Sequence, residues 1–217
     1  GIPPVTLKAK EGLSLINGTQ VMTAVGLLAL LRAERLCKVA DIVGACTLDA
    51  LKGTFSAFDP DIQRVRPFPG QLTVSRNFQK LGKYDPIAES HKSCPKIQDA
   101  YSIRCIPQVH GAVRDALGYV RKTLEVEVNS ATDNPLIFAE RGKILNCGNF
   151  HGEPVAFALD LLGIVVAELG GISERRIEKL INPALSGLPA VLTKKGGLHS
   201  GLMMVQVSAA SLVSENK

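Results

Sequence analysis

The chain has 217 residues, of which 46% are hydrophobic and 21% charged, so it can bury a sizeable core and does not have the composition of a disordered protein. Its formal net charge is +5, but the basic residues are spread along the chain in small groups such as Arg175 and Arg176, with no run of five like charges. This mild excess suits a substrate that carries a carboxylate and argues against nucleic-acid binding.

The cysteines predict neither a disulfide framework nor a structural zinc site, because their number is odd and none are paired as Cys-x-x-Cys. They are Cys37, Cys46, Cys94, Cys105 and Cys147. Reduced thiols are typical of a cytoplasmic protein, and the N-terminus has no charged-then-apolar leader. We therefore predict a cytoplasmic location.

Both ends of the sequence have the features of cuts within a longer protein. The chain opens at Gly1 without an initiating Met, and its last ten residues continue a helical pattern with no stop. We expect residues 1–217 to form a single partial domain, the central region of that longer protein.

The first part of the chain predicts helices around a proline-rich loop. Residues 19–36 are apolar nearly all round, which is typical of a helix buried in a bundle. A second helix is predicted over 41–52, ended by Gly53, and a short one over 71–82. Three prolines mark the segment 60–70 as a loop.

The second part adds a small β element to further helices. A helix is predicted over 97–121, with a kink where Pro107 cannot bond the carbonyl of Ile103. Alternation with period two predicts a strand over 123–128. The other predicted elements are a hairpin of 136–138 and 143–145 around Arg141-Gly142, a long helix over 154–181 and a last helix over 201–217.

The stretch 154–172 is the most apolar of the chain, yet it contains Asp160 and Glu168. These charges favour a buried helix over a membrane span. The elements together predict a mainly α fold, a long-helix bundle with a small β-hairpin element.

Four polar residues stand out around Pro107: Gln98, Tyr101, Arg104 and Gln108. If this segment is one helix, their spacing of three, three and four places them within about a third of its circumference. An arginine there suits a carboxylate, which it can bind through two parallel hydrogen bonds, and a tyrosine can move a proton. The alternative is an ordinary solvated helix face.

Three loops carry further polar groups that also have structural explanations. Asn17 precedes a helix start and either forms a turn there or presents its amide to an anion. The loop 129–135 can satisfy its own backbone, and His151 in the segment 148–153 has the features of a structural hydrogen-bonding residue. The other histidines have no partners at ligand spacing, so no metal is assigned.

Two classes of chemistry are excluded by missing motifs. No Gly-x-Ser-x-Gly elbow occurs, which argues against a serine hydrolase. No Gly-x-Gly-x-x-Gly or Walker-type loop occurs, which argues against nucleotide binding.

Six segments, in order along the chain, resemble the aromatic amino-acid ammonia-lyase family, and most closely its histidine-specific branch. They are 11–20, 98–105, 129–136, 148–153, 186–189 and 214–217. Each is modest alone, but six in the right order over nearly the whole chain are specific. Phe68, Ile106 and Cys147 depart from the family pattern, at positions outside the central chemistry.

The resemblance implies non-oxidative elimination of ammonia from L-histidine to give urocanate, a step of histidine catabolism. Family members carry an electrophile, 4-methylidene-imidazol-5-one, which forms autocatalytically from an internal Ala-Ser-Gly. No Ala-Ser-Gly occurs in these 217 residues. We therefore expect this chain alone to lack the cofactor and to be inactive.

By position, the resemblance implies roles for seven residues. Asn17 and Tyr101 would act at the electrophile and the substrate amine, and Phe150 would pack beside the electrophile. Arg104 would bind the substrate carboxylate. Gln98 and Asn134 would support these groups, and Glu215 would face the substrate side chain.

The residue at position 215 bears on the substrate. A carboxylate suits an imidazole, which offers N–H donors or a positive charge, and relatives acting on phenylalanine or tyrosine often have Gln there. We predict histidine. A phenylalanine or tyrosine ammonia-lyase, a 2,3-aminomutase and a non-catalytic helical scaffold fragment remain as alternatives.

The resemblance also implies a homotetramer in which helices form a shared central bundle and each active site is drawn from several subunits. The apolar helices predicted at 19–36 and 154–181 fit this assembly, because a lone chain would expose too much of them. We predict a homotetramer of the complete enzyme that takes a small amino-acid substrate and binds no nucleic acid and no membrane.

Overall fold

The computed structural model describes residues 1–93 and 96–216. Cys94, Pro95 and Lys217 lie outside the described residues, and with them the predictions made for Cys94 and for the last residue of the final helix. The chain forms two compact units, and each is described here by itself. Unit 1 comprises Gly1–Arg32 and Gly118–Leu162, and unit 2 comprises Ala33–Leu117 and Gly163–Lys217.

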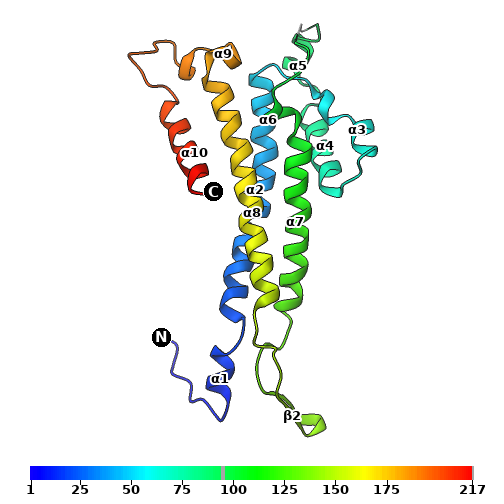
Figure 1. The fold of residues 1–217 in the computed structure, drawn as a ribbon, viewed down its shortest axis with the longest axis vertical. Coiled ribbons are helices and arrows are strands. Elements are labelled where there is room, and N and C mark those ends of the chain that lie inside the picture. Colours follow the sequence, from blue (N-terminus) through cyan, green and yellow to red (C-terminus); the bar gives the residue numbers. More distant parts are fainter. Residues whose placement is uncertain (94–95, 217) are drawn as a thin grey trace. The chain divides into compact units, whose positions relative to one another are not determined.

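Helices make up 66% of the structure, and a two-stranded hairpin accompanies them, so the predicted mainly α fold is confirmed. Figure 1 follows these elements along the chain by colour. The helices are α1 (Glu11–Ile16), α2 (Gln20–Ala50), α3 (Pro60–Arg64), α4 (Pro69–Leu81), α5 (Pro86–Ser90), α6 (Tyr101–Arg104), α7 (Ile106–Glu127), α8 (Glu153–Ile181), α9 (Pro183–Ser186) and α10 (Met203–Glu215), with short 3-10 turns at Phe55–Phe58, Ala139–Arg141 and Ala190–Leu192.

Helix α2 is one continuous helix, so the prediction of two helices over 19–36 and 41–52 is wrong. Residues 37–40 hold no glycine or proline, and Cys37 and Ala40 are buried, so nothing interrupts the helix between the two predicted segments. The helix ends just before Gly53, near the predicted stop.

The predicted strand over 123–128 is also wrong, because α7 runs through it to Glu127. Val113, Leu117, Val120 and Leu124 are all buried, at spacings of four, three and four. This helical pattern began before the alternating segment and continues into it, and burial of its apolar stripe overrides the local period of two.

The expected disruption near Pro107 is confirmed, but it divides the predicted helix over 97–121 into two. Helix α6 ends at Arg104, Cys105 has φ −94° and ψ 8°, and α7 begins at Ile106. Pro107 therefore lies in the first turn of α7, where its missing N–H costs nothing. Gln98 precedes α6, so the four polar residues do not share a face of one helix.

The predicted hairpin is confirmed. Strand β1 (Leu136–Phe138) pairs antiparallel with β2 (Lys143–Leu145), and Ile137 is opposite Ile144. Gly142 has φ +57° at the turn between the strands, a conformation that glycine adopts without steric cost. Figure 1 shows the hairpin within the segment that joins α7 to α8.

The helices predicted over 71–82, 154–181 and 201–217 agree with α4, α8 and α10 to within a few residues, whereas α1, α5 and α9 were not predicted and the predicted loop 60–70 contains α3. Asp59 caps this short helix by accepting a hydrogen bond from the Asp61 N–H at 2.8 Å, and Pro60 occupies its first position. Helix α8 begins one residue before the predicted start and ends at Ile181 as predicted.

Each unit has its own buried apolar residues. In unit 2, Leu48, Phe58, Phe78 and Ile106 are fully buried, and the Phe58 and Phe78 rings stack with centroids 4.0 Å apart. In unit 1, Leu30 of α2, Leu124 of α7 and Val155 of α8 are fully buried.

Two segments, Glu11–Ala50 and Glu153–Ile181, are long and apolar enough to cross a membrane by length and composition alone. Core helices of soluble proteins pass the same test. Many of the apolar side chains on α2 are exposed, among them Val21 at 77% and Val25 at 62%. That these helices are covered by other subunits and not by lipid stays a prediction.

Candidate active site

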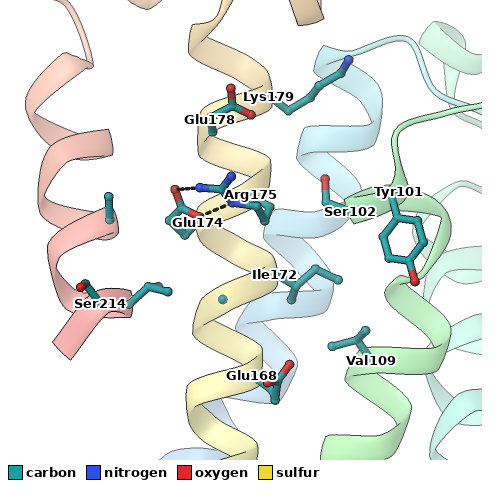
Figure 2. Close-up of a pocket in the computed structure, with 13 residues that line it drawn as sticks. Tyr101, Ser102, Val109, Glu168, Ile172, Glu174, Arg175, Glu178, Lys179 and Ser214 are labelled. Atoms are coloured by element: carbon teal, nitrogen blue, oxygen red, sulfur yellow. Dashed lines mark hydrogen bonds and ion pairs between the residues drawn. The ribbon is translucent and has the colours of Figure 1, made fainter. Parts of the chain in front are cut away.

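A cavity of about 760 Å³ in unit 2 contains one of the predicted catalytic residues, Tyr101. Its walls come from α6, α7, α8 and α10 (Figure 2). The lining residues are Tyr101, Ser102, Val109, Glu168, Gly171, Ile172, Glu174, Arg175, Glu178, Lys179, Ala210, Val213 and Ser214. A mixed lining of apolar and charged groups is typical of sites that bind small polar molecules.

Tyr101 is the first residue of α6, and its side chain is largely exposed. Figure 2 shows its ring projecting from α6 near Val109 of α7 and Ile172 of α8. Its hydroxyl forms no hydrogen bond with any other described residue. The hydroxyl is therefore available to a bound molecule, as a proton donor or acceptor.

Arg104 closes α6 one turn after Tyr101, and it lines a different, smaller cavity of about 100 Å³ together with Gln98 and Asp99. Its Nε donates to the Asp99 carbonyl at 3.0 Å, which leaves the two terminal nitrogens of the guanidinium for a carboxylate. The structure thus brings Gln98 to Arg104 and places Tyr101 in the larger cavity. The Gln108 Oε1 is buried and has no hydrogen-bond partner among the described residues.

Glu215 is the last residue of α10 and is exposed. Its neighbours Val213 and Ser214 line the larger cavity, but Glu215 itself does not. In the single chain, therefore, Glu215, the residue expected to select the substrate, is adjacent in sequence to two lining residues but does not itself line the cavity.

The charged wall of the larger cavity was not identified from the sequence. Arg175 donates from Nε and Nη2 to the two carboxylate oxygens of Glu174, both at 2.5 Å, and this bidentate pair raises the pKa of Arg175. Gln206 of α10 donates to Glu174 Oε1 at 2.9 Å. The charge-rich run 174–179, which follows the most apolar part of the helix 154–181, was the sequence feature that could have indicated this wall.

In unit 1, Asn17 ends α1 beside the polar loop 129–135. Its backbone N–H donates to the Leu13 carbonyl at 2.8 Å, and its side-chain amide has no hydrogen bond within the part of the chain that the structure describes. The next residue, Gly18, contacts the Thr132 carbonyl so closely that an added Cβ would lie 2.2 Å from that oxygen. The glycine therefore lets Asn17 approach the loop.

Two polar links fasten α1 and the start of α2 to the chain around this loop. Asp133 accepts hydrogen bonds from Lys10 Nζ and, at 2.7 Å, from Ser14 Oγ, and these donors lower the pKa of Asp133 to about 2. Thr19 Oγ1 donates to Glu127 Oε1 at 2.5 Å. The loop 129–135 is therefore held by contacts far apart in the sequence and does not merely satisfy its own backbone.

The other two predicted residues of unit 1 lie after this loop. Asn134 Oδ1 accepts a hydrogen bond from the Cys147 N–H at 2.7 Å, so its amide NH₂ remains free to donate to a ligand. Phe150 lies just before α8 and is 40% exposed. Of the seven predicted residues, Asn17, Asn134 and Phe150 belong to unit 1, and Gln98, Tyr101, Arg104 and Glu215 belong to unit 2.

Within the described ranges, no group of three or more His, Cys, Asp or Glu side chains is arranged to hold a metal ion. The donor groups described above are amides, a phenol and a guanidinium, which suit an organic ligand better than a cation.

Comparison with known proteins relates this site to a family. Residues 1–217 match the family described as aromatic amino acid lyase. The histidine ammonia-lyase of Koribacter versatilis is 59% identical over 230 residues, an alignment that covers the whole chain and 45% of that protein. The chain therefore spans less than half the length of this relative.

Solved structures agree with this result. The crystal structure of histidine ammonia-lyase from Trypanosoma cruzi is 50% identical, with a TM-score of 0.88 over 99% of this chain and 40% of that one. The structure of tyrosine aminomutase from Streptomyces globisporus is 39% identical, with a TM-score of 0.91 over 99% of this chain and 45% of that one.

Proposed function

We propose, since this chain belongs to the aromatic amino acid lyase family, that the complete protein is a histidine ammonia-lyase that converts L-histidine to urocanate and ammonia. The observation that carries the proposal is the 59% identity to a histidine ammonia-lyase over the whole chain. The cavity at Tyr101 is consistent with it. The reaction would serve histidine catabolism in the cytoplasm.

The cofactor implied by the family is 4-methylidene-imidazol-5-one, and its Ala-Ser-Gly precursor is not among these residues. The residues present fit such a group: the Asn17 amide has no other partner among the described residues, and the half-exposed Phe150 ring offers an aromatic edge or face to a planar ring. When bound, the group supplies an electrophile for the substrate amine. Asn17 would hold the group by hydrogen bonding, and Phe150 would pack beside it.

The remaining residues would bind and orient the amino acid. Arg104 would pair with the carboxylate through its two terminal nitrogens, with Gln98 beside it and Asn134 at the same end of the substrate. Tyr101, whose hydroxyl is unpaired among the described residues, would hold or move a proton at the amine. Glu215 would accept a hydrogen bond from the imidazole N–H.

A second candidate is a lyase or 2,3-aminomutase acting on tyrosine or phenylalanine. The similarity to tyrosine aminomutase, with a TM-score of 0.91, supports this alternative. Glu215 favours histidine over phenylalanine, because a carboxylate opposite an apolar phenyl ring would lose its hydrogen bonds without gaining one. Tyrosine, whose hydroxyl is also a hydrogen-bond donor, is separated from histidine by comparing the two amino acids as substrates.

We also propose that the complete protein is a homotetramer. The apolar side chains exposed on α2, such as Val21, Val25 and Leu28, are more than a soluble monomer ordinarily leaves uncovered. Light scattering of the complete protein should give four times the subunit mass. A stable, well-folded monomer would contradict the proposal.

The experiment that tests the function has two parts. The complete protein is first analysed by intact mass and peptide mapping, which should find a peptide containing Ala-Ser-Gly that is lighter by two waters. Ammonia release is then measured with L-histidine, L-tyrosine and L-phenylalanine. We expect release from L-histidine with urocanate as the product, and none from the 217-residue chain alone. Release only from tyrosine or phenylalanine would favour the second candidate.

A further inference from the structure

A chain of buried polar side chains in unit 2 ends at the backbone of α6, the short helix that carries Tyr101 and Arg104. Arg176 of α8 is 3% exposed, and its Nη1 donates to the carbonyl of Ser102 at 3.4 Å. The same nitrogen lies 3.4 Å from His110 Nε2, and Nη2 donates to Ser173 Oγ at 3.0 Å. Arg176 thus joins α8 to α6 and to α7.

The protonation of His110 follows from its two partners. A guanidinium only donates, so His110 Nε2 must accept from Arg176 and carries no proton. Its Nδ1 then carries the proton and donates to Asp41 Oδ1 at 2.8 Å. Burial lowers the pKa of His110, in agreement with a neutral ring.

The far end of the chain is anchored on two more helices. Asp41 of α2 also accepts from Arg114 Nη2 at 2.6 Å and from Asn77 Nδ2 of α4 at 2.8 Å. The Asp41 and His110 side chains are buried almost completely. The path from Asp41 through His110 and Arg176 to Ser102 is therefore a fixed, water-excluded connection within one unit.

Helix α6 needs such an anchor. It has four residues, too few for a helix that is stable on its own, and it ends at the break before Pro107. Beyond its own backbone hydrogen bonds, α6 is held by the buried Ile103 side chain, by the hydrogen bond from Arg104 Nε to the Asp99 carbonyl just before the helix, and by the contact from Arg176. Ser102 lies between Tyr101 and Arg104, so the carbonyl to which Arg176 donates belongs to the backbone that orients both side chains.

We infer that Arg176, oriented by His110, is a positioning residue that fixes the geometry of Tyr101 and Arg104. The inference rests on the proposed function, in which these two residues meet the substrate. Arg176 itself lies outside the lining of the cavity, whereas its neighbour Arg175 is part of that lining.

The first test does not depend on catalysis. Amide hydrogen exchange is measured on the complete protein as wild type, Arg176→Lys and Arg76→Lys. Lysine keeps the charge but cannot reach Ser102, His110 and Ser173 together from one planar group. We expect the amides of Ile103, Arg104 and Cys105 to exchange at least about tenfold faster in Arg176→Lys and unchanged in Arg76→Lys, which alters an exposed arginine of α4. Equal protection in all three proteins would overturn the inference.

The second test is kinetic. A displacement of about 1 Å in a catalytic group costs on the order of 100-fold in rate, so Arg176→Lys should lower kcat and raise KM together, with kcat/KM down at least about tenfold. In a background that carries both Tyr101→Phe and Arg104→Lys the same change should cost less than about twofold, because both residues that it positions are already altered. Equal losses in both backgrounds, in a variant whose Tm is unchanged, would overturn the inference.

A second variant covers the case in which Arg176→Lys does not fold. His110→Asn keeps a donor for Asp41 but removes the ring nitrogen that accepts from Arg176. It should also speed amide exchange in α6 and lower kcat/KM, by a smaller factor than Arg176→Lys. Should the wild-type protein release no ammonia from any amino acid, the proposed function fails, and the exchange experiment still decides whether Arg176 fixes α6.

Discussion

The backbones of Gly70 and Gly111 are in direct contact, at the point where the start of α4 meets α7. A Cβ on Gly70 would lie 2.0 Å from the Gly111 carbonyl oxygen, and a Cβ on Gly111 would lie 2.5 Å from the Gln71 nitrogen. Asp115, one turn after Gly111, accepts a hydrogen bond from the Gly70 N–H at 2.8 Å. Any side chain at position 111 would therefore have to push two backbones apart.

We predict that Gly111→Ala lowers the free energy of unfolding by about 3 kcal/mol or more, because backbone atoms cannot turn aside as a side chain does. Gly118→Ala is the matched control, since it lies on the same helix with no atom within 4 Å of the added Cβ. The control should be stabilised by about 0.5–1 kcal/mol, as expected for alanine in a helix interior. Denaturant unfolding of both variants measures these changes, and similar changes in the free energy of unfolding for the two variants would refute the steric explanation.

How much of this fold the sequence predicts depends on whether the deciding contacts are local. The hairpin 136–145 was predictable because its turn and alternation lie within ten residues, and Gly142 supplies the positive φ. The C-terminal end of α7 was not predictable in this way, because the sequence of 123–128 has the alternation of a strand. The helix is favoured only by the burial of Val120 and Leu124 against residues distant in the sequence.

The same distinction applies to the site. Tyr101 and Arg104 were identified from a resemblance that extends along the chain, and their spacing alone left a solvated helix face as an alternative. The contact of Arg176 with Ser102 joins residues 74 positions apart, and the bond of His110 to Asp41 joins residues 69 positions apart. Such pairings arise when segments distant in the sequence pack together, so no local sequence pattern predicts them.

Asp41 should make unfolding depend on pH. Burial opposes its ionisation, but hydrogen bonds from His110 and Asn77 and the charge of Arg114 outweigh burial and lower its pKa below the ordinary 3.8. A carboxyl whose pKa is lowered in the folded state contributes stability above its unfolded pKa and loses it as the pH falls through the folded pKa. The contribution of Asp41 should therefore be full at pH 7 and decline below about pH 4.

Asp41→Asn should cost about 3 kcal/mol at pH 7, because it leaves the mostly buried Arg114 guanidinium without its carboxylate and weakens the hydrogen bonds from His110 and Asn77. The difference from wild type should shrink as the pH falls below about 4 and through the lowered pKa of Asp41. Asp61→Asn, at an exposed ion pair with Arg64, is the control and should change stability by less than about 1 kcal/mol. A difference that does not vary with pH would count against the role assigned to the Asp41 charge.

The contribution of Asp49 to the free energy of unfolding should depend on pH in the opposite direction. Burial and the adjacent Asp85 carboxyl raise the pKa of Asp49 to about 6. Asp49 Oδ1 and Asp85 Oδ2 are both buried without a hydrogen-bond partner among the described residues. Since the folded-state pKa is raised, its stabilising contribution is present below pH 3.8 and is lost as the pH rises through about 6.

We predict that Asp49→Asn raises Tm at pH 8, by about 2–4 °C if the new amide gains one hydrogen bond to Asp85. At pH 4, where Asp49 already holds a proton in the folded protein, the gain should disappear. Asp59→Asn, which changes a helix-capping carboxylate to another good cap, is the control and should give no gain at pH 8. A gain of equal size at both pH values would mean that charge repulsion is not the cause.

Glu215 is the residue on which the choice of substrate depends, and Glu215→Gln changes its charge with almost no change in shape. A hydrogen bond to a charged group contributes about 1.5–3 kcal/mol, so kcat/KM of the complete protein for L-histidine should fall about 10- to 100-fold. Glu140→Gln, at an exposed glutamate in the turn of the hairpin, is the matched control and should leave turnover unchanged. Unchanged turnover of L-histidine by Glu215→Gln would remove the argument for histidine, and activity on phenylalanine or tyrosine would then have to be measured in the wild-type protein.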